Sequence, residues 1–114
     1  MERDGRTYLY DIAQSCRNIR IFTQGVDFQI YAANLLIKSA VERQFIIIGE
    51  AINRLKQIDE FAYGKISQAG QIVGFRNILV HGYEVVSDQL VWEVIQKHLK
   101  ELEELCEQLL NENL

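Results

Sequence analysis

Apolar residues recur at every third or fourth position along most of the chain, which is the spacing of one buried face of an α-helix. Four segments show this pattern, and the sequence predicts a helix in each of them, over residues 7–23, 28–58, 71–81 and 88–110. No proline interrupts these segments. The pattern therefore predicts an all-α fold, an up-and-down bundle of four to five helices in one domain that spans residues 1–114.

Residues with strong positional preferences mark the ends of the predicted helices. Gly25 is expected to end the first helix, and Asp27 to cap the second. Gly82 is expected to stop the third helix, and Ser87 to cap the fourth. Residues 59–70 have the weakest pattern and are predicted to form a loop with a short helical turn.

The second predicted helix, residues 28–58, is the longest, and we expect it to be continuous. Gly49 lies in its interior, where glycine costs about 1 kcal/mol relative to alanine. A glycine at such a position indicates that another backbone packs close to it or that the helix bends. The predicted apolar face of this helix consists of Ala33, Leu36, Ile37, Ala40, Val41, Ile47, Ile48, Ala51, Ile52 and Leu55.

The two cysteines and one of the two histidines are interpreted as structural. Cys16 and Cys106 lie far apart in the sequence and are expected to be free, buried thiols. His98 lies on the apolar face of the fourth predicted helix, so we expect it to be packed in the core or in an interface. The spacing of His98 from His81 gives no metal-ligand pattern, and neither a metal site nor a cofactor is expected.

Composition and charge restrict the classes of function. Apolar residues make up 48% of the chain and charged residues 25%, as in an ordinary globular protein. The longest apolar run, residues 45–48, is too short to span a bilayer, and the first residues form no apolar signal segment, so we expect no membrane association and a cytoplasmic location. The net charge of −4 is unlike that of a general polyanion binder. Contact with nucleic acid would therefore need a local basic cleft or a second copy of the chain.

The candidate chemistry is concentrated at the end of the third predicted helix. Arg76 and Asn77 precede a short apolar run, and His81 follows it. Five helical steps separate Arg76 from His81, so on an ideal helix the two side chains point about 140° apart. They converge only if Arg76 curls around the helix, if the helix end unwinds, or if two molecules meet there. A homodimer would also pool the basic groups of two chains.

These residue types suit the cleavage of RNA phosphodiesters without a metal ion. A neutral imidazole at His81 can take the proton from a ribose 2′-hydroxyl. The guanidinium of Arg76 can hold the phosphate, and Asn77 can donate to a phosphate oxygen or orient the arginine. The spacing alone is a weak pattern. Glu50 is interpreted either as an exposed or interface carboxylate or as a supporting group of this site, and Tyr83 alone could be a loop aromatic.

Residues 76–83 match an R-x4-H-x-Y motif and resemble the HepT family of toxins within the HEPN superfamily. The resemblance extends over most of the chain. Further matching segments are residues 10–12, 23–25, 40–43, 48–51 and 91–92. The family often has a proline before the motif helix, whereas residues 59–70 contain none.

The resemblance implies a helical homodimer whose paired motifs form a metal-independent ribonuclease cleft, with Arg76 and His81 as the catalytic pair. It implies that Asn77 is the polar residue that often follows the arginine. It also implies a partner in a type VII toxin–antitoxin system, a minimal nucleotidyltransferase antitoxin that uses ATP. That antitoxin would transfer AMP to Tyr83, adding negative charge and bulk beside the cleft.

Two other functions are compatible with the residues. The chain could be a non-catalytic, substrate- or nucleotide-binding subunit of a two-component nucleotidyltransferase, with the motif as a phosphate clamp. It could also be a structural dimerisation module, with the second and fourth predicted helices as the interface.

Overall fold

The computed structural model of the protein describes residues 4–82, 84 and 86–112. Within these residues the chain forms helices and no strand, which confirms the predicted all-α fold. The helices are α1 (Gly5–Phe22), α2 (Phe28–Ala33), α3 (Leu35–Ile58), α4 (Glu60–Lys65), α5 (Ala69–His81) and α6 (Asp88–Glu112). None of the described helices is long and apolar enough to cross a membrane.

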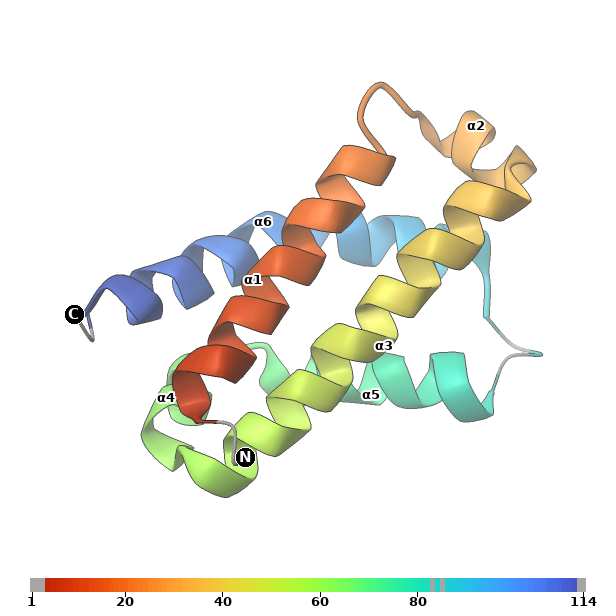
Figure 1. Cartoon of the computed structure of the whole chain (residues 1–114). Coiled ribbons are helices and arrows are strands. Elements are labelled where there is room, and N and C mark those ends of the chain that lie inside the picture. Colours follow the sequence, from red (N-terminus) through yellow and green to blue (C-terminus); the bar gives the residue numbers. More distant parts are fainter. Residues whose placement is uncertain (1–3, 83, 85, 113–114) are drawn as a thin grey trace.

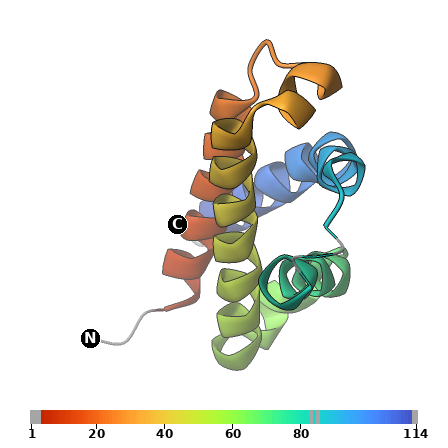
Figure 2. The same cartoon turned by 90° about the vertical axis from the view of Figure 1, so that its right-hand side faces the viewer.

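The helices form two layers (Figure 1). α1 and α3 run antiparallel and side by side in the front layer, and α5 and α6 cross behind them in opposite directions. The view turned by 90° separates the two layers clearly (Figure 2). α1 packs against both α3 and α6, while α3 also packs against α5, so α3 connects the first helix to the helix that carries the motif.

The core fills the space between the layers with side chains from every helix. Its largest fully buried side chains include Tyr31, Phe45, Leu9, Ile12, Ile19, Ile48, Ile52 and Leu55. Each apolar side chain of this size stabilises the fold by about 1.5–3 kcal/mol when it is buried. Phe45 of α3 meets Phe75 of α5 edge to face, with the ring centroids 5.1 Å apart, and this contact fixes α5 on α3.

The prediction of one continuous helix over residues 28–58 is wrong, because the chain breaks at Asn34 between α2 and α3. The backbone of Asn34 is extended, and its side-chain oxygen accepts a hydrogen bond from the backbone N–H of Ile37 at 2.9 Å. Asn34 thus caps α3. This capping hydrogen bond is an alternative to continuing the helix from α2 through Asn34. The break turns Leu36 outward, where it is 80% exposed instead of part of the predicted apolar face.

The predicted helix boundaries are otherwise close to the observed ones. The segment expected to be a loop with a short turn contains the helix α4, whose N-cap Asp59 accepts from the backbone N–H of Ala62 at 3.0 Å. Asp27 caps α2, and the hydroxyl of Ser87 accepts from the backbone N–H of Leu90 at the start of α6, as predicted. Gly82 is the C-cap of α5.

Two features of the interior concern polar groups. Cys16 and Cys106 are free and buried, as predicted, and burial raises the pKa of the Cys106 thiol to about 12. The sequence did not predict that Glu103 is buried on α6. Its two carboxylate oxygens accept hydrogen bonds from Arg20 of α1 at 2.6 and 2.7 Å, so the ion pair joins the two layers.

Candidate functional site

The motif helix α5 packs on α3 through an apolar face, and a backbone hydrogen bond defines its C-terminus. Ile72, Phe75 and Leu79 of α5 are buried, as their spacing predicted. The backbone N–H of Gly82 donates to the carbonyl of Ile78 at 2.8 Å and closes the last turn. Arg76, Asn77 and His81 therefore project from a helix whose position and end are both fixed.

The stem of Arg76 lies directly on Gly49 of α3. A β-carbon at residue 49 would overlap the Cβ atom of Arg76 and would lie 2.5 Å from its Cγ atom. Real β-carbons do not approach other atoms so closely, so only glycine fits at this crossing. The close packing that Gly49 indicated is thus confirmed, and the neighbouring group is the candidate arginine itself.

The guanidinium of Arg76 is held from two sides. Its Nη2 atom donates to Oε1 of Glu50 on α3 at 3.1 Å, and its Nη1 atom donates to Oδ1 of Asn77 at 2.9 Å. The Arg76 side chain is 20% exposed, whereas that of Glu50 is 52% exposed. The arginine is therefore partly buried and oriented, with its charge balanced by a carboxylate that remains open to solvent.

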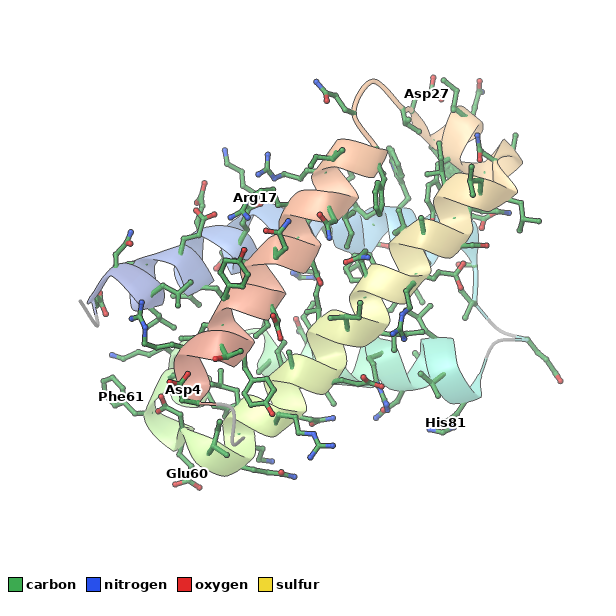
Figure 3. All side chains as sticks on the ribbon, in the orientation of Figure 1. Asp4, Arg17, Asp27, Glu60, Phe61 and His81 are labelled. Carbon is green, nitrogen blue, oxygen red and sulfur yellow. The ribbon has the colours of Figure 1, made fainter. Side chains whose placement is uncertain are left out.

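His81 is the last residue of α5 and is exposed to solvent. Figure 3 shows its side chain at the C-terminal end of α5, pointing away from the other helices. Among the described residues, no hydrogen bond joins His81 to Arg76, whose guanidinium donates to Glu50 and Asn77 instead. Within one chain, therefore, the guanidinium of Arg76 is held against α3, while the imidazole of His81 is exposed at the C-terminal end of α5. Tyr83 of the motif lies outside the described residues.

The other histidine lies at a groove between α5 and α6. His98 is half-buried, and its Nδ1 atom is buried with no hydrogen-bond partner in the described part of the chain. The groove measures about 400 Å³. Its lining is mainly apolar and consists of Gln71, Ile72, Gly74, Phe75, Ile78, Leu90, Val94 and His98. Across residues 4–82, 84 and 86–112, no group of three or more His, Cys, Asp or Glu is placed to hold a metal ion.

A second pocket, which the sequence analysis missed, is lined in part by Glu50, the residue that accepts from Arg76. It measures about 280 Å³ and lies between α1 and α3. Its lining consists of Tyr8, Asp11, Ile47, Glu50, Ala51 and Arg54. The sequence does carry a signal, because Tyr8 and Asp11 are three residues apart and Glu50 and Arg54 four apart, which places each pair on one helix face. Only the packing of α1 on α3 brings the two pairs together.

Comparison with known proteins gives relatives along nearly the whole chain. A protein of Methanocaldococcus jannaschii, named as a candidate RNase, is 29% identical over 106 residues, which are 93% of this chain and 96% of the relative. A protein of Caldanaerobacter subterraneus with the same description is 30% identical over 105 residues, 92% of this chain and 93% of the relative. The "Probable ribonuclease HepT" of Thermococcus cleftensis is 27% identical over 109 residues, 96% of this chain and 98% of the relative.

A comparison with solved structures gave no match. The family model described as "Ribonuclease HepT-like" matches residues 12–109, a range that holds Gly49, Glu50 and the motif helix. The chain therefore belongs to the ribonuclease HepT-like family of the HEPN superfamily.

Proposed function

We propose that the protein is a metal-independent ribonuclease and the toxin component of a type VII toxin–antitoxin system that acts in the cytoplasm. Family membership and relatives named as ribonucleases support the proposal. The structural observation that carries it is the guanidinium of Arg76, which Glu50 and Asn77 hold in place on the same helix as the exposed His81. Phosphodiester cleavage needs a positioned cation and an accessible imidazole, and this helix carries both.

The proposed reaction begins at the ribose next to the scissile phosphate. His81 takes the proton of the 2′-hydroxyl, and the 2′-oxygen attacks the neighbouring phosphorus. The bond from phosphorus to the 5′-oxygen breaks, the leaving 5′-oxygen takes a proton from the imidazolium of His81, and a 2′,3′-cyclic phosphate remains on the other product. Arg76 holds the non-bridging oxygens and stabilises the charge that develops on them.

We propose that the site is completed by a second copy of the chain. Within one chain the guanidinium of Arg76 is turned toward α3, whereas His81 projects from the end of α5. The apolar groove between α5 and α6, together with the partly exposed Ile78 and Val80 of α5, supports an interface along this helix. Pairing two motif helices would also gather two arginines and two histidines in one cleft, although the whole chain has a charge of −4.

Glu50 is proposed to position the arginine. Its Oε1 atom accepts from Nη2 of Arg76 at 3.1 Å, and its side chain is 52% exposed. In the free protein the stem of Arg76 lies over Gly49, and this pair fixes the guanidinium at the end of that stem. An RNA phosphate that enters the cleft can then share the arginine, because Nη1 and Nη2 each carry a second N–H beside the one that Asn77 or Glu50 accepts.

The proposed control is the transfer of AMP to Tyr83 by a nucleotidyltransferase antitoxin. The phenol oxygen of Tyr83 would attack the α-phosphorus of ATP, pyrophosphate would leave, and the phenol proton would pass to a base of the partner. The product carries a negative phosphodiester two residues after His81. Charge and bulk at that position would repel and block an RNA phosphate.

The experiment that tests the ribonuclease proposal compares RNA cleavage in EDTA by the wild type, Arg76→Ala and His81→Ala. Arg43→Ala, which changes an exposed arginine of α3, serves as the control. We expect cleavage by the wild type and by the control only. Equal cleavage by all four proteins would overturn the proposal. Binding of nucleotides that needs Arg76, without cleavage, would instead support a binding subunit of a two-component nucleotidyltransferase.

A further inference from the structure

Arg54 carries an exposed positive charge one helical turn beyond the residue that holds Arg76. Glu50 and Arg54 are four residues apart on α3, about 6 Å along the helix axis, and both face the surface pocket between α1 and α3. A glutamate commonly pairs with an arginine four residues later on the same helix. Glu50 instead accepts from Nη2 of Arg76 at 3.1 Å, so Arg54 lacks the carboxylate that its own helix offers.

No other side chain takes the place of that carboxylate. Within residues 4–82, 84 and 86–112, Arg54 forms neither an ion pair nor a side-chain hydrogen bond. Arg17 and Arg20 of α1, by contrast, are paired with carboxylates of α6. The open charge of Arg54 therefore makes this part of α3 locally positive, although the whole chain has a charge of −4.

Asn53 lies between Arg54 and the stem of Arg76 around the helix. It follows Gly49 by four residues and so shares the face of α3 on which the arginine stem lies, where α5 crosses behind α3 (Figure 1). Asn53 is half-buried, and its amide makes no side-chain hydrogen bond to any described residue. Its NH₂ group can donate to a phosphate oxygen. Asn53 and Arg54 thus offer open donors one turn beyond Gly49 and Glu50, the two residues that seat Arg76.

We propose that Asn53 and Arg54 bind the phosphate next to the scissile one, in an RNA strand whose scissile phosphate is held by Arg76. One turn of α3 is comparable with the separation of neighbouring phosphates along an RNA strand. The proposal rests on the ribonuclease function and specifies its substrate as an RNA with a phosphate beyond the scissile one. Because this contact is the same before and during the reaction, it strengthens substrate binding without acting on the reacting atoms.

The test measures kcat and KM for RNA cleavage in EDTA by the wild type, Arg54→Ala and Arg54→Lys. We expect Arg54→Ala to raise KM by about fivefold, as for the loss of an exposed ion pair, and to leave kcat unchanged. Lysine keeps the charge and should restore most of the affinity. Arg43→Ala is the matched control, because it removes an exposed arginine of α3 about two turns before Glu50, and it should leave KM unchanged.

A second arm measures the binding of oligouridylate to the His81→Ala protein over a range of salt concentrations. The logarithm of the affinity falls with the logarithm of the salt concentration by about 0.7 for each phosphate neutralised on a single strand. Arg54→Ala in this background should therefore reduce the slope by about 0.7. Asn53→Asp keeps the shape of the side chain but adds a negative charge, so it should weaken binding while Arg54 is intact.

Three results would overturn the proposal: a KM and a salt slope that Arg54→Ala leaves unchanged, an equal effect of Arg43→Ala, or no salt-dependent binding of oligouridylate. The two arms separate this contact from the ribonuclease function. Normal cleavage with an unchanged KM and slope overturns the contact alone. A slope that depends on Arg54 in a protein that cleaves no RNA contradicts the ribonuclease function alone.

Discussion

The side chain of Arg76 crosses α3 at Gly49 so closely that a β-carbon at residue 49 would overlap the Cβ atom of the arginine. This contact explains why a glycine occupies the interior of a helix of 24 residues, where it lowers helix stability. It also links fold to site, because the position of the candidate phosphate-binding group depends on how closely α5 approaches α3.

Gly49→Ala tests this contact. Alanine in an open helix interior would stabilise the protein by about 1 kcal/mol, but overpacking against the arginine costs about 1–3 kcal/mol. The clash exceeds the gain in propensity, so we expect a lower melting temperature and loss of RNA cleavage. Gly64→Ala in α4 is the matched control, because a β-carbon there meets no atom within 4 Å. A Gly49→Ala protein as active and as stable as the wild type would contradict the contact.

Glu50→Gln removes the charge that orients Arg76 while keeping the shape of the side chain. Because Glu50 is 52% exposed, we expect the free energy of unfolding to change by less than about 1 kcal/mol. A misplaced guanidinium should nevertheless lower kcat/KM for RNA by about 10- to 100-fold. Glu93→Gln removes the carboxylate of the exposed pair with Lys97 and should leave cleavage unchanged. The proposed role fails if the two variants cleave RNA equally.

Tyr83→Phe should keep ribonuclease activity and abolish its control, because phenylalanine lacks the phenol oxygen that would accept AMP. Incubation with the partner nucleotidyltransferase and ATP should add the mass of one AMP to the wild type and stop cleavage. The same treatment should leave Tyr83→Phe unmodified and active. Tyr10→Phe, at an exposed tyrosine of α1, should behave like the wild type. Modification of Tyr83→Phe would show that another residue accepts AMP.

The ion pair between Arg20 and Glu103 should make stability depend on pH. The hydrogen bonds from Arg20 lower the pKa of Glu103 below its ordinary value of 4.5. A lowered pKa means that the pair stabilises the fold above the pKa of the unfolded chain, and that this contribution is lost as the pH falls through the folded value.

Arg20→Ala should therefore lower the free energy of unfolding by about 1 kcal/mol at pH 7, because it leaves a carboxylate that is only 9% exposed without its main partner. Arg17, at 3.9 Å from Glu103, limits the loss. Denaturant unfolding at several pH values checks the result, with Arg43→Ala as the control. The difference from the wild type should shrink below about pH 4.5. A difference that is constant with pH would contradict the role of this pair.

The sequence predicted the features that depend on local pattern. Periodicity located the helices, Gly82 and Ser87 marked two helix ends, and Gly49 signalled a close approach. The break at Asn34 was missed because the apolar period continues across it, while the capping hydrogen bond to Ile37 decides the local structure. The apolar period shows which face of a segment is buried. It does not show where a single side chain, here that of Asn34, caps a new helix and so interrupts the preceding one.

Glu50 was predicted as a candidate supporting residue, but the contacts that build the site join distant segments and were not predicted. The bond from Arg76 to Glu50 joins residues 26 positions apart and needs the register of α5 on α3. The pocket that contains Asp11 needs the packing of α1 on α3. Sequence patterns indicate which face of a helix is buried, but not which residue of another helix it meets.

The measurement that tests the central claim most directly mixes two inactive variants, Arg76→Ala and His81→Ala, and follows RNA cleavage in EDTA. If each site takes its arginine and its histidine from different chains, the mixed dimer contains one intact site. Random exchange of subunits makes half of the dimers mixed, so the mixture should recover about a quarter of wild-type activity. A mixture that remains inactive after subunit exchange, or a single variant that cleaves like the wild type, would contradict the composite ribonuclease site.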